Sequence, residues 1–177
     1  TFGPMAPGVP GTVAALHQAW QRHGSMPWPE LLKPAHKLAQ QGFEVGHDLA
    51  NVLNMAATIF NVHASGSAYL KQDGQPWQAG DLLVQKDLAW SIGQIMEHGA
   101  DAFYRGELAD AIVAAFAKSG GIIVHKDLDA YRVKERVPVS TDYRGKRVVS
   151  MPPVSGGGVT LLQMLNMLEN FPLADMG

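Results

Sequence analysis

The spacing of apolar residues changes once along this 177-residue chain, near residue 131, and that change limits the folds open to it. Before it, apolar residues recur every three or four positions in short stretches that end at Gly or Pro, as in amphipathic helices. Pro34 should break the second of these helices, because a proline inside a helix removes a hydrogen bond and clashes with the preceding turn. We expect helices over about 11–23, from Pro27 to Gly42, over 47–60, over 86–98, over 101–105 and from Leu108 to Gly120, with a loop over 63–80.

Beyond residue 131 the spacing moves toward two, which is typical of strands. Val133, Val137 and Val139 precede a turn-forming cluster that ends at Gly145, so we expect a β-hairpin over about 132–151. The run from Met151 to Gly158 joins a Pro pair to three Gly, and it should be neither strand nor helix interior. A last helix should run from Leu161 to Phe171. The sequence therefore predicts a mainly α (α+β) protein: a helical region over 1–131, then a hairpin and a strand-loop-helix corner over 132–177.

Composition excludes several classes of function. The chain has no Cys, so disulfides, thiolate metal sites and Cys nucleophiles are ruled out. A net charge of -2 does not suggest a nucleic-acid-binding surface. No apolar run approaches the roughly 18 residues that a membrane-spanning helix needs. The first residues resemble no signal peptide, so we expect that one was removed or that the chain begins inside a longer protein.

The corner before the last helix is the first candidate site. Consecutive backbone N–H groups at Ser155, Gly156 and Gly157 could hold an anion or an oxyanion at the start of a helix. The sequence lacks the Gly-Lys-Ser/Thr of a phosphate-binding loop, and the Gly spacing is not that of a dinucleotide fold. From composition alone, a tight turn with close backbone packing is the favoured alternative.

Other residues that could carry chemistry have structural explanations. The seven His are scattered without zinc-helix spacing, and His23 and His98 stand where a cation favours a helix C-terminus. Asp127 and Asp129 lie two apart, so on a helix they face different ways, and Asp127 is placed to cap. Thr1 could be an N-terminal nucleophile, but no strand follows to hold it, so an arbitrary chain start is favoured.

A series of short segments, in collinear order from residue 8 to the end, resembles the large subunit of the γ-glutamyltranspeptidases. The segments are Gly8-Val9-Pro10-Gly11-Thr12-Val13-Ala14, Lys33-Pro34-Ala35, Leu38-Ala39, Gly42-Phe43, Asp87-Leu88-Ala89, Gly99, Phe103-Tyr104-Arg105-Gly106, Gly120-Gly121, Asp127-Leu128, Tyr131, Arg136 to Pro138, Tyr143-Arg144-Gly145, Met151-Pro152-Pro153, Gly156-Gly157, Leu165-Asn166 and Leu168-Glu169.

This resemblance implies an N-terminal nucleophile hydrolase with an αββα sandwich, whose precursor cleaves itself into a large and a small subunit. The new N-terminal Thr of the small subunit attacks the γ-glutamyl amide of glutathione or a related compound. The acyl-enzyme then passes its γ-glutamyl group to water, or to an amino acid or peptide. The family uses no metal or organic cofactor, and its bacterial members are periplasmic or secreted. The partners of this chain would be the small subunit and the N-terminal part of the same precursor.

The family's catalytic residues do not carry over to this chain. The nucleophile begins a Thr-Thr-His-like segment that is absent here, and the substrate-carboxylate Arg lies upstream of the Val-Pro-Gly motif. Thr1 aligns with neither. The family's Pro-Pro-Pro-Ser-Ser-Gly-Gly loop matches Pro152 to Gly157, with Val154 and one Ser, so a backbone role next to the site is retained. The expected substrate-binding candidates are therefore Ser155, Gly156 and Gly157, with no catalytic or metal-binding residue.

The expected role is that of an inactive scaffold fragment of a γ-glutamyltransferase and hydrolase. Two alternatives stay open: a stand-alone helical interaction module, and a fragment of a cephalosporin-acylase-like relative. A fragment should expose apolar surface on the hairpin and last helix, and could self-associate through it. A stand-alone module should not.

Overall fold

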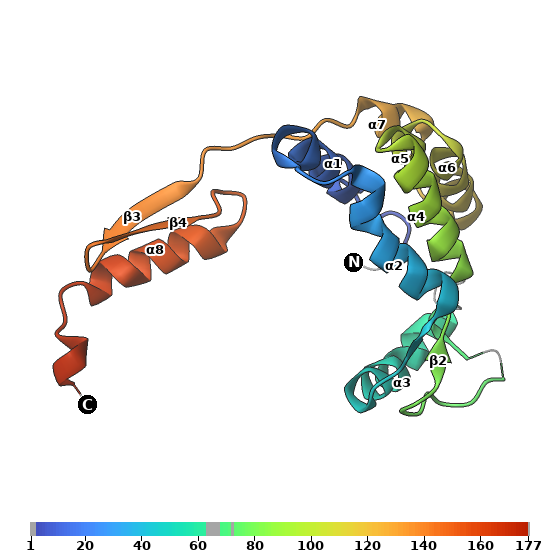
Figure 1. Cartoon of the computed structure of the whole chain (residues 1–177), viewed down its shortest axis with the longest axis horizontal. Helices are drawn as coiled ribbons and strands as arrows, with labels where there is room; N and C mark the ends of the chain where they lie inside the picture. The colour runs from blue at the N-terminus through green and yellow to red at the C-terminus, as the bar shows by residue number, and fades with distance from the viewer. Residues whose placement is uncertain (1–2, 63–67, 72, 177) are drawn as a thin grey trace. The chain divides into compact units, whose positions relative to one another are not determined.

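The computed structural model describes residues 3–62, 68–71 and 73–176, and contacts divide the chain into two units, Thr1–Val133 and Lys134–Gly177 (Figure 1). The sequence places its division after residue 131, two residues earlier. Arg132 belongs with the first unit because its guanidinium donates to the backbone oxygens of Asp129 and Tyr131, at 2.5 and 2.7 Å. The described chain is mainly helical, with two small antiparallel sheets.

Helical spacing in the first unit produces helices close to the predicted ranges. They are α1 (Thr12–His23), α2 (Trp28–Gln41), α3 (His47–Val62), α4 (Lys86–His98), α5 (Asp101–Tyr104) and α6 (Glu107–Ser119); a further helix, α7 (His125–Ala130), had no predicted range. Glycines close several of them, as expected: Gly120 follows α6 in the left-handed conformation, with φ 78°. Within the loop expected over 63–80, Asp73 and Gly74 form a turn, with Gly74 at φ 71°.

Pro34 does not break α2, and that prediction was wrong. The helix runs unbroken from Trp28 to Gln41 with Pro34 inside it. Both halves of the helix are fixed to the neighbouring segment. The Trp28 indole donates to the Ile95 oxygen at 2.9 Å, and the Gln85 N–H donates to the Ala39 oxygen at 3.0 Å. Tertiary packing therefore offsets the hydrogen bond that Pro34 removes, as it often does local propensity.

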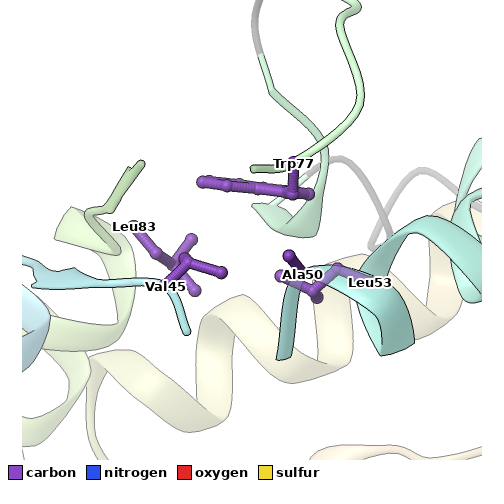
Figure 2. Packing of buried hydrophobic residues seen from close by; sticks show 5 residues of the cluster. All are labelled: Val45, Ala50, Leu53, Trp77 and Leu83. Carbon is purple, nitrogen blue, oxygen red and sulfur yellow. The ribbon is translucent and has the colours of Figure 1, made fainter. Parts of the chain in front are cut away.

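A two-residue strand pair in the first unit was not predicted. Strand β1 (Phe43–Glu44) pairs with β2 (Leu82–Leu83) in antiparallel register, Phe43 opposite Leu83. The Val45 N–H also donates to the backbone carbonyl oxygen of Asp81 at 2.8 Å. Such short strands show no alternating pattern. Their pairing is set by packing around them, where Val45, Ala50, Leu53, Trp77 and Leu83 form a buried cluster (Figure 2).

A second buried cluster joins the chain's beginning to α5, α6 and α7. Its fully buried members are Tyr104, Ala109, Ile123 and Leu128, and partly buried residues that include Val9, Val13, Phe116 and Tyr131 pack around them. The rings of Tyr104 and Tyr131 are stacked, with centroids 5.5 Å apart. Gly11 lies against this pair, since a Cβ there would overlap the Tyr131 hydroxyl.

The second unit is a hairpin covered by one helix. Strands β3 (Val139–Tyr143) and β4 (Lys146–Ser150) pair in antiparallel register, Tyr143 opposite Lys146. This confirms the predicted hairpin but not its start, because residues 132–138 are not strand. Arg144 and Gly145 form its turn, both at positive φ, 48° and 71°. That pattern is the type I′ turn, whose twist suits two-residue hairpin loops. Helix α8 (Gly156–Leu168) lies along the hairpin (Figure 1), and a short 3-10 turn, Leu173–Asp175, follows.

Helix α8 begins five residues earlier than predicted and ends three residues earlier, so the three glycines are helical rather than loop. The first N–H groups of any helix lack intrahelical partners, so its first turn makes fewer demands on propensity. Gly158 is required there, because a Cβ would overlap the Met151 carbonyl oxygen. The close approach of strand end and helix start, and the apolar helix that follows, outweigh the glycines' conformational entropy.

Candidate functional site

The corner between β4 and α8 holds the substrate-binding candidates Ser155, Gly156 and Gly157. Ser155 is the N-cap residue of α8 and is exposed, and its side chain makes no capping hydrogen bond among the described residues. Gly156 and Gly157 are also exposed. Within the described chain, a Cβ at Gly156 would meet no atom within 4 Å, and one at Gly157 only the Ser155 hydroxyl oxygen at 3.7 Å. Packing therefore demands glycine at position 158 but not at the two positions before it.

The corner can present backbone N–H groups at the positive end of the α8 dipole. Val154, just before Ser155, is 92% exposed, so an uncharged side chain stands at the outer edge of the corner.

The far end of α8 is attached to the hairpin turn through Glu169. Both carboxylate oxygens of Glu169 accept from the backbone N–H of Arg144, at 3.1 and 2.9 Å. The Arg144 guanidinium in turn donates to the Phe171 oxygen at 3.0 Å. One turn earlier on the helix, the Thr141 hydroxyl donates to the Asn166 side-chain oxygen at 2.6 Å. Sequence reasoning gave these residues no role, although Tyr143-Arg144-Gly145 and Leu168-Glu169 were among the segments that carried the resemblance.

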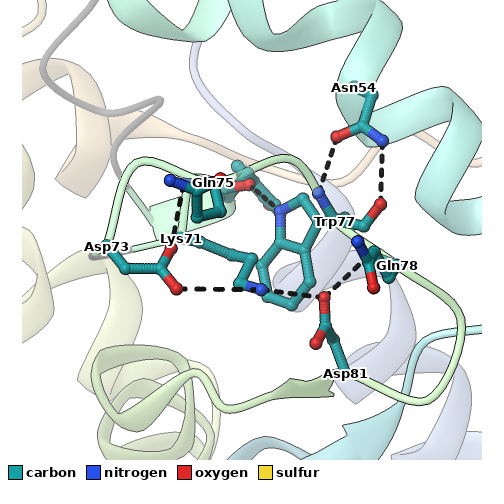
Figure 3. A network of polar contacts seen from close by, with 8 residues as sticks. Asn54, Lys71, Asp73, Gln75, Trp77, Gln78 and Asp81 are labelled. Carbon is teal, nitrogen blue, oxygen red and sulfur yellow. Dashed lines mark hydrogen bonds and ion pairs between the residues drawn. The ribbon is translucent and has the colours of Figure 1, made fainter.

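A polar network connects Asn54 of α3 and described residues between Lys71 and Asp81 (Figure 3). The Asn54 side chain pairs with the backbone of Trp77. Its amide nitrogen donates to the Trp77 carbonyl oxygen at 2.9 Å, and its amide oxygen accepts from the Trp77 N–H at 2.8 Å. Asp81 accepts from the Gln78 N–H at 2.7 Å and from the Lys71 ammonium at 3.0 Å. The Gln78 N–H, and then Lys71, hold the pKa of the Asp81 carboxyl below its usual range.

This network borders a pocket of about 660 Å³. The pocket is lined by Trp77, by Lys71 and Asp81, and by backbone and side chains over 82–88. Three of its charged groups pair with one another, because the Lys71 ammonium lies 3.0 Å from Asp81 and 3.9 Å from Asp73. We interpret the network as a structural feature of the loop.

The remaining sequence candidates have the structural roles expected of them. Asp127 caps α7 by accepting from the Val124 N–H at 3.0 Å. Asp129 instead binds the Arg105 side chain at 2.6 Å, and with Asp101 it raises the pKa of that guanidinium. His23 and His98 lie in the last turns of α1 and α4. The described residues hold no cluster of His, Asp and Glu that could bind a metal ion. Thr1 and His63 lie outside the described residues.

Within the described chain, no helix combines the length and the apolar character needed to cross a bilayer.

Comparison with known proteins gives matches over the whole chain. The sequence model of the γ-glutamyltranspeptidase family matches residues 1–177. The glutathione hydrolase proenzyme of Escherichia coli is 43% identical over 174 residues, which is 98% of this chain and 30% of that protein. The crystal structure of Helicobacter pylori γ-glutamyltranspeptidase superposes with a TM-score of 0.95 at 41% identity, covering 99% of this chain and 50% of that one. A cephalosporin acylase from Bacillus halodurans superposes with a TM-score of 0.84 at 30% identity, covering 96% and 34%.

Proposed function

Because this chain belongs to the γ-glutamyltranspeptidase family, we propose that the whole protein cleaves γ-glutamyl amides such as glutathione and passes the γ-glutamyl group to water, an amino acid or a peptide. The match of the family model over residues 1–177 carries this proposal. The chain spans about a third of the length of the curated relatives it matches, so the activity requires residues beyond these 177.

The proposed chemistry is nucleophilic acyl transfer. The hydroxyl oxygen of an N-terminal Thr on the small subunit bonds to the γ-carbonyl carbon, and the Thr α-amine takes the hydroxyl proton. The amide C–N bond then breaks and the amine leaves with that proton. Water or an acceptor amine attacks the resulting ester and restores the Thr. No metal or organic cofactor is needed for these steps.

Residues 1–177 act in this proposal as scaffold of the large subunit. Apolar side chains on the hairpin, just after it and on α8 support that role, because they are exposed to solvent: Val149 is 57% exposed, Met151 66%, Met164 51% and Met167 61%. A self-contained domain seldom leaves so many large apolar residues exposed on one small unit. We assign their cover to the rest of the precursor, its N-terminal part and the small subunit.

The corner at Ser155, Gly156 and Gly157 lies next to the active site in this proposal and helps to position the sandwich there. A backbone role fits the exposed glycines, whose first-turn N–H groups have no intrahelical partners. The Ser155 hydroxyl, which caps no helix among the described residues, is the only side-chain donor that this corner offers to a substrate.

A chromogenic γ-glutamyl anilide tests the division of labour. The full-length, processed protein should release the coloured amine, and purified residues 1–177 should not. Substituting Ala for the first Thr of the Thr-Thr-His-like segment should abolish release by the full-length protein. Turnover by residues 1–177 alone would contradict the scaffold role, and an inactive, correctly processed full-length protein would contradict the proposed activity.

A second candidate activity is acyl transfer from a different substrate, as in the cephalosporin acylase whose structure matches at 30% identity. The same full-length preparation, offered a glutaryl or other dicarboxylic acyl β-lactam amide beside the γ-glutamyl anilide, separates the two. Preferential release from the γ-glutamyl compound is the expected result.

The third candidate is the stand-alone helical interaction module. It predicts that residues 1–177 stay monomeric and bind little hydrophobic dye. The scaffold proposal predicts the opposite, dye binding and concentration-dependent self-association, which light scattering measures. By family resemblance we also propose a periplasmic or secreted location, which fractionation of cells that express the full-length protein would check.

A further inference from the structure

We infer that Glu169 is a positioning residue for the corner at Ser155, Gly156 and Gly157, acting along the length of α8. The inference rests on the proposed function, because it concerns the geometry of that same corner. It follows from the way in which α8 is attached to the hairpin at its two ends.

The first attachment is the contact between Gly158 and Met151. The start of α8 approaches the end of β4 so closely that a Cβ at Gly158 would overlap the Met151 carbonyl oxygen. Gly158 is buried, whereas Gly156 and Gly157 are exposed. This contact fixes the distance between the start of the helix and the end of the strand. Further along, the Thr141 hydroxyl donates to the Asn166 side-chain oxygen at 2.6 Å, one turn before Glu169.

The second attachment lies at the C-terminal end of the helix. Arg144 occupies the first turn position of a type I′ hairpin, where its N–H has no partner in the strand ladder. The Glu169 carboxylate supplies it with two oxygens, at 3.1 and 2.9 Å. A hydrogen bond to an ionised acceptor is stronger than a neutral one. Glu169 therefore joins the C-terminal end of α8 to the tip of the hairpin.

Helix α8 itself connects this attachment to the corner. Thirteen residues of helix span about 20 Å, and a helix of that length moves as a rigid rod. Without the Glu169 carboxylate, the far end of the helix keeps the Thr141–Asn166 hydrogen bond but loses its ionised link to the hairpin tip, so the helix can shift about Gly158 and displace the short corner that enters it. Displacements of about 1 Å near reacting groups reduce rates by as much as about a hundredfold, mainly through lost orientation. The expected loss is in kcat rather than in substrate binding.

The test uses the full-length, processed enzyme and the γ-glutamyl anilide. Glu169→Ala should lower kcat about tenfold, per molecule of processed enzyme, and leave KM within about twofold. Glu169→Gln keeps an oxygen acceptor for the Arg144 N–H and should recover most of that loss. Asp175→Ala, at an exposed carboxylate six residues further on, is the matched control and should keep the wild-type kcat.

A second measurement does not depend on activity. Amide hydrogen exchange in the full-length, processed enzyme should show faster exchange at Arg144 and at Gly158 in Glu169→Ala than in the wild type. Unchanged exchange at Gly158 would overturn the inference, as would an unchanged kcat in Glu169→Ala or a Gln variant as impaired as Ala. If the wild-type enzyme is inactive but Glu169→Ala still exchanges faster than the wild type at Gly158, the proposed function is contradicted and the inference about Glu169 is not.

Discussion

The hydroxyl of Tyr104 donates to the carbonyl oxygen of Pro10 at 2.7 Å, across 94 positions of the chain. The Tyr104 hydroxyl oxygen also accepts from the Ala14 N–H at 3.3 Å, in the first turn of α1. Tyr104 is 5% exposed, and burial raises the pKa of its hydroxyl, so the group is neutral and able to donate. One side chain thus ties the segment before α1 to α5.

Tyr104→Phe should lower the free energy of unfolding of residues 1–177 by about 1 kcal/mol, because both hydrogen bonds are lost while the ring stays packed. Urea denaturation followed by far-UV circular dichroism measures the change. Tyr69→Phe, at a tyrosine that is 40% exposed, is the matched control and should have little effect. Equal losses in the two variants would contradict the role given to Tyr104.

Gly11→Ala should destabilise the first unit by about 1–3 kcal/mol, because the new methyl group overlaps the Tyr131 hydroxyl and forces the ring to move. Gly8→Ala is the control, since no described atom lies within 4 Å of a Cβ there. The same urea experiment compares the two. Adding Tyr131→Phe to Gly11→Ala should restore part of the loss, which a double-mutant cycle would measure as a favourable coupling.

Asn54→Ala should expose the backbone of Trp77, because the Asn54 amide satisfies both its N–H and its C=O. We expect a loss of about 1–3 kcal/mol, the usual cost of leaving partly buried polar groups unpaired. The amide hydrogen exchange rate at Trp77 should rise in the same variant. Asn51→Ala, on the exposed side of the same helix, should leave that exchange rate unchanged; a similar increase there would point to general loosening of α3.

Asp81→Asn should make unfolding less sensitive to acid. The native pKa of Asp81 is lowered, by the Gln78 N–H first and by Lys71 second, so its ionised form stabilises the native state at neutral pH. That contribution is present above the ordinary value of 3.8 and is lost as the pH falls through the lower native value. The wild type should therefore be the more stable protein at pH 7, and the difference should shrink below about pH 4.

Urea midpoints at several pH values from 7 to 3 would check this prediction. Asp73→Asn is the comparison, because Asp73 is more exposed and lies 3.9 Å from the Lys71 ammonium, against 3.0 Å for Asp81. The loss of stability at pH 7 should therefore be smaller in Asp73→Asn than in Asp81→Asn. A constant difference between wild type and Asp81→Asn over the whole range would show that the charge of Asp81 is not what stabilises the loop.

The sequence by itself determined the helices and the late hairpin of this protein, together with its family. Helical spacing from Lys86 to His98 predicts α4 with its observed bounds, and the Val-rich segments around Gly145 predict β3 and β4. These features are local, because amphipathic spacing and turn residues act within a few positions. The same holds for Asp127, whose place at a helix start was enough to predict its capping bond.

Only the tertiary structure decided the features that depend on distant partners. Strands β1 and β2 are two residues each and pair through the burial of Trp77 and Val45. Helix α2 continues through Pro34 because the segment around α4 secures both its halves. Glycine at 158 is helical because the end of β4 approaches it. In the first two cases the deciding free energy comes from contacts between segments far apart in sequence, and in the third from a close approach of two backbone segments. Spacing along the chain reports neither.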